Sequence, residues 1–330
     1  GSNVAYALEA KGAGPLVIVD WLGVDDKWRN IAKRTLYDIV APENIDGFLH
    51  ENAHDVTAIV HMGAISATTE RDADLIVDTN FRLSRDLWRF CAATGTPFIY
   101  ASSAATYGDG TDGFDDDMSA TALGALSPLN AYGWSKLLFD RWVARELATD
   151  QARPPQWAGL RFFNVYGPNE YHKGRMQSVV SQIQPLAAKD TACKLFKSHN
   201  PDYADGGQLR DFVSVDDCAD VICWLLETPA VSGLFNLGTG QARSFADLAA
   251  TVYRAMDKEP MIDFVPTPED IREKYQYFTE AKMTRLRDAG YNGQFTPLEV
   301  GVSRYVQDFL ANTDPYDICH PIPEHRSGHL

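Results

Sequence analysis

The 330-residue sequence is poor in cysteine, in positive charge and in long apolar segments, and each shortage excludes a class of protein. Its five cysteines form no C-x-x-C pair and no Cys/His spacing typical of zinc, so we expect reduced thiols, a cytoplasmic location and no metal site. Lysine and arginine number 30 against 45 acidic residues. The resulting net charge of −15 argues against a general binder of nucleic acids or anionic membranes. No stretch has the pattern of a signal peptide or the roughly 18 apolar residues of a membrane span.

What is present is an alternation of short apolar runs with helix-length amphipathic stretches. The hydrophobic content of 45% and the charged content of 23% are ordinary for a globular protein. Strands are predicted over 15–20, 57–64, 97–104, 157–167 and 233–239, and helices over 1–12, 78–95 and 131–147. This order predicts an α/β fold with a doubly wound parallel sheet, the Rossmann architecture.

The pattern becomes looser after Gly167, where a helix is predicted in "SVVSQIQPLAAK" and a strand in "CKLFK". We therefore expect a second, smaller α/β lobe that binds substrate. The predicted dinucleotide-binding domain comprises residues 1–167 and 211–258, and the substrate domain comprises 168–210 and 259–330. The tail from about residue 317 to 330 is expected to be disordered.

The opening helix leads into a strand that ends at Asp20. In a dinucleotide-binding unit, an acidic residue at this place binds the adenosine ribose, and the helix before it starts at a glycine-rich turn that holds the pyrophosphate. We expect that turn and the first strand of the sheet upstream of these residues. Gly1 is either the last glycine of the turn or an unrelated residue, and the sequence leaves both readings open.

Polar residues follow three of the predicted elements where a doubly wound sheet binds its ligand. Gly63 follows one strand, Ser103 ends the next, and "NAYGWSK" begins a helix that carries Tyr132 and Lys136. A Tyr-x-x-x-Lys spacing alone is a weak signal. Together with a serine at a strand end, it suits the removal of a proton from an alcohol while a hydride leaves the same carbon.

The lysine is needed because a free phenol is a poor base near neutral pH. A phenol has a pKa of about 10, so working near pH 7 requires a shift of about three units, or about 4 kcal/mol. A neighbouring ammonium group and a positively charged nicotinamide ring favour the phenolate by charge.

The motifs "SSAATYG", "YGWSK", "RFFNVYGPNEYHKGRM" and "RDFVSVDDCADV" resemble the extended short-chain dehydrogenase/reductase superfamily. The combination of "HKGRM" with "KYQYFTEAKMTRLRDAGY" is similar, within it, to the ADP-L-glycero-D-manno-heptose 6-epimerases of bacterial lipopolysaccharide synthesis. The resemblance covers nearly the whole chain. It implies an isomerase that inverts C6″ of an ADP-heptose with a retained cofactor, NADP with NAD not excluded. It also implies a homo-oligomer, a pentamer in that family.

The resemblance also implies roles for individual residues. Ser103, Tyr132 and Lys136 match the catalytic set, and Lys173 matches a second acid/base on the opposite face of the sugar. The implied cofactor positions are Gly1, Ser2, Asp20, Trp21, Lys27, Met62, Gly63, Ala64, Ser66, Asn80, Tyr132, Lys136, Val165 and Lys173. The implied substrate positions are Ser103, Asn164, Arg175, Gln182, Phe196, Arg210 and Tyr275.

Some of these positions depart from the family pattern. Trp21 replaces a polar residue, Arg175 stands where some members have serine, and Gln182 stands where some have histidine. Asp20 would repel the 2′-phosphate of NADP unless Lys27 or Arg29 offsets its charge. A cluster of basic residues suits the diphosphate of a nucleotide sugar; its members are Lys173, Arg175, Lys194, Lys197 and Arg210.

Three other functions share this fold. A sugar-nucleotide 4,6-dehydratase needs an acidic pair after the catalytic hydroxyl residue, but Ala104 and Ala105 follow Ser103. A UDP-hexose 4-epimerase would not require Lys173. A non-catalytic nucleotide-binding relative would not require Tyr132.

Overall fold

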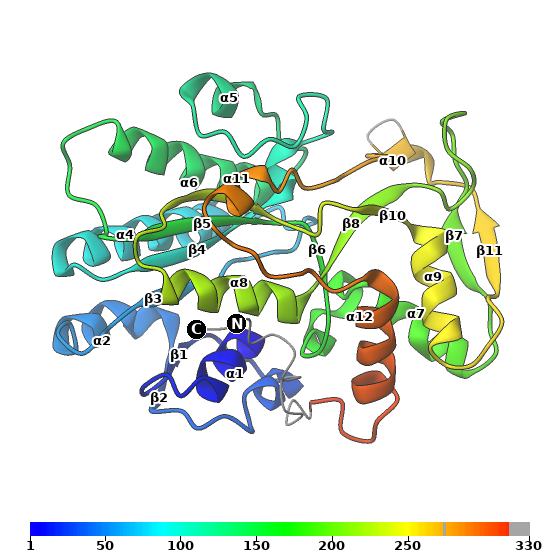
Figure 1. Cartoon of the computed structure of the whole chain (residues 1–330), viewed down its shortest axis with the longest axis horizontal. Coiled ribbons are helices and arrows are strands. Elements are labelled where there is room, and N and C mark those ends of the chain that lie inside the picture. The colour runs from blue at the N-terminus through cyan, green and yellow to red at the C-terminus, as the bar shows by residue number, and fades with distance from the viewer. Residues whose placement is uncertain (273–274, 317–330) are drawn as a thin grey trace.

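A parallel sheet organises the larger part of the chain in the computed structural model, which describes residues 1–272 and 275–316 (Figure 1). Its four strands lie in the order β3-β4-β5-β9. A separate parallel pair joins β1 to β2. The strands are β1 (Val17–Val19), β2 (Asp38–Val40), β3 (Ile59–His61), β4 (Phe98–Ser103), β5 (Trp157–Phe162) and β9 (Gly233–Leu237). The predicted α/β fold with a parallel sheet is confirmed.

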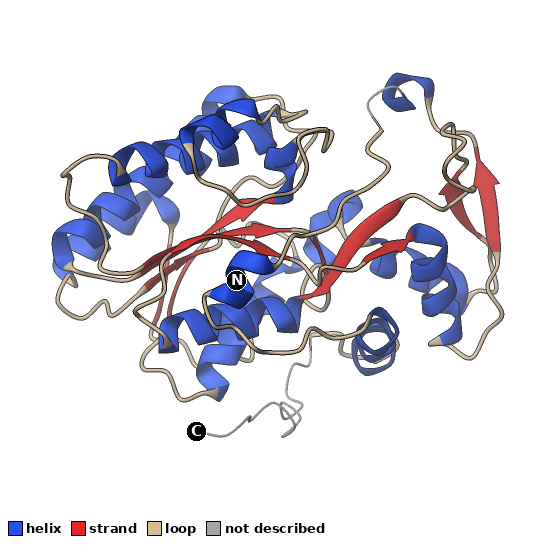
Figure 2. Ribbon diagram, turned by 45° about the horizontal axis from the view of Figure 1, so that its top comes forward, coloured by secondary structure: helices blue, strands red, loops and turns tan. Residues whose placement is uncertain are grey.

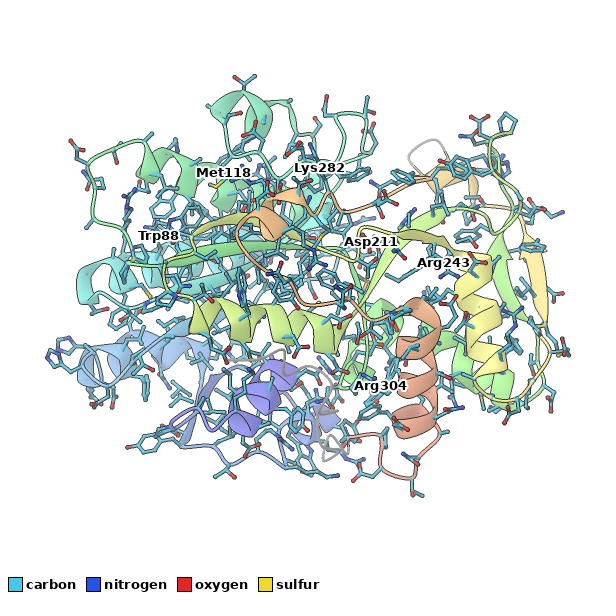
Figure 3. The ribbon with its side chains drawn as sticks, viewed as in Figure 1. Trp88, Met118, Asp211, Arg243, Lys282 and Arg304 are labelled. Atoms are coloured by element: carbon cyan, nitrogen blue, oxygen red, sulfur yellow. The ribbon has the colours of Figure 1, made fainter. Side chains whose placement is uncertain are left out.

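Helices cover both faces of the four-stranded sheet (Figure 2). Side chains alternate between the faces of a strand, so Phe98 and Tyr100 enter one core while Ile99 enters the other. Trp88 fills the first core between its helix and β4 (Figure 3). Helices α2 (Ile45–Glu51), α4 (Leu83–Thr94) and α6 (Ala131–Leu147) cover the first face, and α1 (Ser2–Ala10) and α8 (Val215–Glu227) cover the second.

The predicted helices are confirmed, with one change of length. The helix predicted over 78–95 begins earlier, at α3 (Ala73–Ile76), where the Asp72 side chain accepts a hydrogen bond from the Leu75 amide. It passes through the π-helical segment η3 (Val77–Arg82) into α4 and ends at Gly95, whose φ of 72° is left-handed. Glycine adopts this conformation without a steric penalty, which explains the end of the helix.

The strand predicted over 157–167 is divided in two at Phe163. After β5 the chain leaves the main sheet and forms β6 (Asn164–Tyr166), which pairs with β8 (Leu209–Ser214). β10 (Ala242–Ser244) completes this three-stranded sheet. The buried carboxylate of Asp211 on β8 (Figure 3) accepts hydrogen bonds from the amides of Thr239, Gly240 and Ala281, so it joins segments far apart in the sequence.

A second hydrophobic core lies beyond this sheet. β7 (Cys193–Phe196) pairs in parallel with β11 (Ile262–Val265), and α7 (Val179–Ala188) covers them. The predicted helix and strand of this lobe are therefore confirmed. The same core contains residues of α9 (Phe245–Arg254), α12 (Leu298–Arg304) and η6 (Tyr305–Leu310), so a helix inside the range 211–258 packs against the second lobe.

The other elements are short. They are η1 (Asp26–Asn30), η2 (Pro42–Asn44), η4 (Ala104–Tyr107), α5 (Ala120–Ala125), η5 (Tyr171–Met176), α10 (Glu269–Arg272) and α11 (Thr284–Asp288). The sequence pattern did not predict β2, whose three residues are too few for a clear alternation. The tail predicted to be disordered, 317–330, lies outside the described residues, as does Cys319.

Three observations concern the cysteines, the metal-ligating side chains and the helices. The described cysteines, Cys91, Cys193, Cys218 and Cys223, are free and buried. Within 1–272 and 275–316, no three His, Cys, Asp or Glu side chains are grouped so that they could hold a metal ion. In the same part of the chain, no helix combines the length and the apolar character that crossing a membrane requires.

Candidate active site

The first turn of α6 lies directly against the backbone that follows β4. The Asn130 side chain caps the helix by accepting a hydrogen bond of 2.8 Å from the Gly133 amide. A β-carbon at Gly133 would lie 2.6 Å from the Ala105 carbonyl oxygen, so only glycine permits this approach. The approach brings Tyr132 close enough to Ser103 for the serine side chain to lower the pKa of the phenol.

Burial and charge set the ionisation of the Tyr132–Lys136 pair. Burial raises the pKa of Tyr132, and the nearby Ser103 side chain acts in the opposite direction. The Lys136 side chain is only 3% exposed, and burial lowers its pKa to about 8 although Asp140 opposes the change. Lys136 is therefore still protonated at neutral pH, and it loses its charge as the pH rises past about 8. A cation one helical turn from the phenol is the arrangement that phenolate formation needs.

His61, which the sequence analysis did not select, ends β3 beside this pair. Its Nε2 lies 2.9 Å from the Ser84 hydroxyl, which itself donates to the Asn80 carbonyl. Since Ser84 has only one proton to donate, its oxygen accepts from His61 Nε2–H, and Nδ1 is left unprotonated. Burial and the charge of Lys136 lower the pKa of His61 to about 3. The imidazole is thus neutral and adds no second positive charge beside Lys136.

Asn80 holds the loop after β3 against α6. Its side chain, 1% exposed, accepts a hydrogen bond of 2.9 Å from the Ile65 amide and donates one of 3.0 Å to the Ile65 carbonyl. It also donates to the Ser135 hydroxyl at 3.0 Å. The loop contains the predicted cofactor positions Met62, Gly63, Ala64 and Ser66. Asn80 therefore fixes the place where these residues can meet a cofactor.

A buried ion pair fastens α6 to the sheet one turn after Lys136. Asp140 accepts hydrogen bonds from Arg161 Nε at 3.1 Å, from Arg161 Nη2 at 3.0 Å and from the Ser102 hydroxyl at 2.9 Å. Both charged side chains are fully buried. The Arg161 guanidinium also lies 4.8 Å from the centre of the Tyr107 ring. These contacts join β4, β5 and α6 beneath the Ser103–Tyr132–Lys136 set.

The predicted adenosine end of the site lies at the end of β1. Lys27 Nζ is 2.7 Å from Asp20 Oδ1 and 2.8 Å from the Trp21 carbonyl. The Trp21 indole, 51% exposed, donates a hydrogen bond of 2.7 Å to Glu43. The carboxylate of Asp20 thus has a cation beside it before any ligand binds.

Lys173 lies on η5, which approaches the adenosine end. The side chain is exposed. Its charge and that of Lys27 lower the pKa of His172, after the larger effect of burial. The start of α1 lies in the same region, because Ser2, next to Gly1, accepts a hydrogen bond of 3.2 Å from Asn169. The structure therefore brings Lys173 near the predicted cofactor residues of the first domain.

Three predicted substrate residues meet in the second lobe. The rings of Phe196 and Tyr275 are 6.0 Å apart, and the Arg210 guanidinium lies 5.8 Å from the centre of the Tyr275 ring. Arg210 donates to the Gln276 carbonyl at 2.6 Å, and the Gln276 side chain donates to the Gly108 carbonyl at 2.9 Å. Gln276, which the sequence analysis did not select, therefore links this group to the loop after Ser103.

The remaining substrate positions are Asn164 on β6, Arg175 on η5 and Gln182 on α7. The Gln182 amide donates to the Gln177 carbonyl at 2.7 Å and to the Arg175 carbonyl at 3.4 Å, so these two predicted positions are neighbours. Arg175 is exposed. Asn164 begins β6 and is also exposed, and Val165 follows it.

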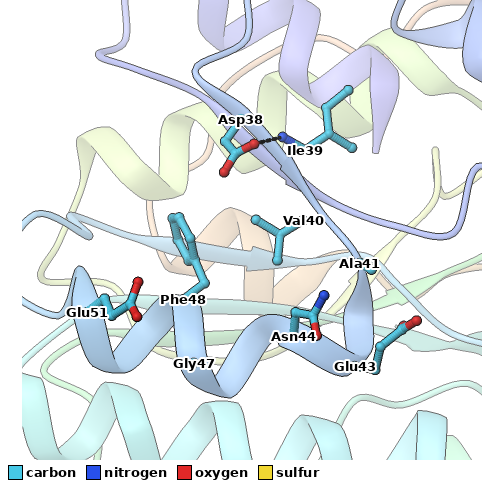
Figure 4. Close-up of a pocket in the computed structure, with 9 residues that line it drawn as sticks. All are labelled: Asp38, Ile39, Val40, Ala41, Glu43, Asn44, Gly47, Phe48 and Glu51. Atoms are coloured by element: carbon cyan, nitrogen blue, oxygen red, sulfur yellow. Dashed lines mark hydrogen bonds between the residues drawn. The ribbon is translucent and has the colours of Figure 1, made fainter.

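A shallow pocket of about 500 Å³ lies between β2 and α2 (Figure 4). Asp38, Glu43 and Glu51 contribute carboxylates to its lining, and none of the predicted site residues lines it. Because these carboxylates repel a diphosphate, we do not assign the nucleotide to this pocket.

Comparison with known proteins gives a consistent picture. The NAD dependent epimerase/dehydratase family matches residues 1–238. The chain is 51% identical over 318 residues, 96% of both chains, to ADP-L-glycero-D-manno-heptose-6-epimerase of Nitratidesulfovibrio vulgaris strain DP4. It is 46% identical over 324 residues, again 96% of both chains, to the protein of that name from Fusobacterium nucleatum.

Two solved structures are similar to the fold. The crystal structure of Helicobacter pylori ADP-L-glycero-D-manno-heptose-6-epimerase gives a TM-score of 0.76 at 25% identity, covering 94% of this chain and 93% of that one. Thermus thermophilus UDP-glucose 4-epimerase, solved in complex with NAD, gives a TM-score of 0.70 at 22% identity, covering 93% and 94%. The second likeness concerns the fold alone.

Proposed function

The chain belongs to the NAD dependent epimerase/dehydratase family, and we propose that it is an ADP-L-glycero-D-manno-heptose 6-epimerase. It inverts C6″ of ADP-D-glycero-D-manno-heptose in the synthesis of the lipopolysaccharide core precursor. The observation that carries this proposal is the 51% identity over 96% of the chain to an epimerase of that name, in a chain whose Ser103 lies beside Tyr132, one helical turn from Lys136.

The chemistry uses this chain's own acids and bases around a nicotinamide cofactor. A bound nicotinamide supplies the reversible hydride acceptor that inversion through a ketone needs. Tyr132 takes the hydroxyl proton of C6″, and the Lys136 ammonium stabilises the phenolate that carries the negative charge. The Ser103 hydroxyl orients Tyr132 and the sugar hydroxyl. The loop that Asn80 holds in place and the Asp20 side chain both lie at the carboxyl ends of strands, where this fold binds a dinucleotide.

Inversion needs a second acid/base, since the ketone receives the hydride on its other face and the oxygen then points elsewhere. We assign this role to Lys173. It is exposed on η5, near the predicted cofactor residues. Arg210, with Phe196 and Tyr275, is assigned to the nucleotide diphosphate, because guanidinium binds phosphate oxygens in a bidentate manner.

The decisive test is to incubate the full-length protein and its cofactor with ADP-D-glycero-D-manno-heptose and to follow the C6″ configuration by NMR. We expect interconversion of the two epimers, and no turnover of UDP-glucose or UDP-galactose in parallel reactions. Lys173→Ala should abolish the inversion, whereas a UDP-hexose 4-epimerase would not need this residue. Absence of interconversion with cofactor present would overturn the proposal.

We propose NADP as the cofactor, because the Lys27 ammonium lies beside Asp20 and offsets its charge. Lys27→Ala should weaken NADP binding about tenfold and leave NAD binding within about twofold, since only NADP places a phosphate there. Titration of each cofactor by calorimetry measures both affinities. Lys33→Ala, which removes a lysine further along the chain that pairs with Asp314, serves as the control. An equal loss for both cofactors, or tighter binding of NAD by the unchanged protein, would refute the assignment.

The remaining proposals concern organisation and location. We propose the lobes 1–167 with 211–258 and 168–210 with 259–330 as dinucleotide-binding and substrate domains. A cytoplasmic location is supported by the free, buried cysteines. A homo-oligomer, a pentamer as in the family that the chain resembles, is tested by light scattering of the full-length protein.

A further inference from the structure

The η5 loop, which carries Lys173, is held at its base by one buried carboxylate. Glu170, 5% exposed, precedes the loop, and Ser178 follows it. Glu170 Oε2 accepts a hydrogen bond of 2.6 Å from the Ser178 amide, and Oε1 accepts one of 2.6 Å from the Ser178 hydroxyl. A single side chain therefore closes the two ends of residues 171–177 on each other.

The same carboxylate attaches the closed loop to the core of the second lobe. Glu170 Oε1 also accepts a hydrogen bond of 2.9 Å from the hydroxyl of Tyr305, which is buried among the residues of that core. Hydrogen bonds to a buried carboxylate are stronger than those between neutral groups. Three of them on one side chain make Glu170 the rigid point from which the loop begins.

The loop itself has a defined shape between its two ends. The Lys173 amide donates to the Glu170 carbonyl at 2.9 Å, and the Gln177 side chain donates to the Tyr171 carbonyl at 2.8 Å. Gly174 has a φ of 54°, a left-handed conformation that glycine adopts without strain and that turns the chain directly after Lys173. The backbone of Lys173 is thus specified from both directions, although its side chain is exposed.

The far side of the loop contacts the first domain. His172 Nδ1 lies 3.0 Å from the Asn30 side chain, and Asn169, just before the loop, donates to Ser2 at the start of α1. The loop consequently spans the region between the predicted cofactor residues and the second lobe, and its position is defined relative to both.

From these contacts we propose that Glu170 is the positioning residue of Lys173. Its carboxylate holds the ends of the loop together, so that the Lys173 ammonium meets one face of the sugar and not the other. This inference rests on the proposed function, because it concerns the second acid/base of the inversion. Productive proton transfer requires placement within about 0.5 Å, which an open loop would not provide.

The two bases act on different epimers. The effect of a variant on each epimer therefore shows whether it misplaces Lys173 or destabilises the whole protein. From either epimer, the first half-reaction oxidises the C6″ alcohol to a ketone: the hydride would pass to the bound nicotinamide and the hydroxyl proton to one side chain. The second half-reaction returns the hydride and a proton to the ketone. One epimer delivers its proton to Tyr132 and the other to Lys173. A residue that acts through Lys173 must therefore affect the oxidation of one epimer and spare the other.

The experiment mixes full-length enzyme carrying oxidised cofactor with each epimer separately and follows the near-ultraviolet absorbance of the reduced nicotinamide in a single turnover. Lys173→Ala identifies the epimer that depends on Lys173. Glu170→Ala should slow the oxidation of that same epimer by about tenfold to a hundredfold and leave the other within about twofold, the cost of a misplaced catalytic group. Glu170→Gln should restore part of the rate, since its amide oxygen still accepts from the Ser178 amide.

If Glu170→Ala slows the oxidation of both epimers equally, its role is merely structural and the inference is overturned. If it slows the oxidation of neither epimer, the inference is overturned as well. If Glu170→Ala does not fold, Tyr305→Phe removes one of the three hydrogen bonds and should give the same preference between epimers at smaller size. If Tyr305→Phe leaves the oxidation rates of the two epimers in the same ratio as in the original enzyme, the proposal is also contradicted. Failure of the proposed function is distinguishable, because the unaltered enzyme would then not interconvert the epimers at all.

Discussion

Replacing Tyr132 by phenylalanine is expected to lower the rate of inversion by about 10²- to 10⁴-fold, the usual contribution of a positioned acid/base. The substitution removes only the hydroxyl, whose pKa responds to Ser103, and keeps the aromatic ring in the first turn of α6. We therefore expect the cofactor content and the melting temperature to stay close to those of the original protein. The rate is measured by NMR of the C6″ configuration.

Tyr37→Phe is the matched control for this experiment. Tyr37 is 71% exposed and lies outside the proposed site, so its hydroxyl should not affect the rate. A Tyr132→Phe protein that works within about threefold of the original would show that another group takes the proton. It would also favour the non-catalytic nucleotide-binding alternative, which does not need this phenol.

Replacing Asp140 by alanine is expected to destabilise the fold by about 3–5 kcal/mol, the cost of breaking a buried ion pair by removing one partner. The change leaves the fully buried guanidinium of Arg161 without its carboxylate and removes the acceptor of the Ser102 hydroxyl. Burying an uncompensated charge costs far more than losing an exposed one. The free energy of unfolding is measured by urea denaturation of the full-length protein with cofactor absent.

Two further variants test the reason for this loss. Glu227→Ala breaks the exposed ion pair with Lys11, whose atoms are 2.8 Å apart, and should cost no more than about 1 kcal/mol. The double variant Asp140→Ala, Arg161→Met removes both buried charges and should recover part of the stability that the single change loses. If Asp140→Ala costs no more than Glu227→Ala, the buried pair does not stabilise the fold as we argue.

The main sheet was predictable because its strands carry continuous apolar runs of sufficient length. β4 and β5 each occupy six residues that are buried almost throughout, and such runs stand out in the sequence. The division at Phe163 was not predictable, since aromatic and β-branched residues continue on both sides of Asn164 in "FFNVY" and contain no turn signal. Only the pairing of β6 with β8 separates it from β5.

That Tyr132 and Lys136 lie next to each other was predictable from local geometry alone. Residues four apart on a helix lie on the same face, so Tyr132 and Lys136 are neighbours wherever α6 packs. The supporting residues were not predictable, because their partners are distant in the sequence. Asn80 bonds to Ser135, 55 residues away, and Glu170 bonds to Tyr305, 135 residues away.

The amino-acid sequence by itself determined the succession of strands and helices, the serine at a strand end and the tyrosine one turn from a lysine. These features depend on periodicity and on neighbours within a few residues, which the sequence displays directly. The tertiary structure alone decided the lowered pKa of Lys136 and the neutral state of His61. It also decided the closure of the loop that carries Lys173. Ionisation depends on burial and on charges brought together from distant segments, so no local pattern contains it.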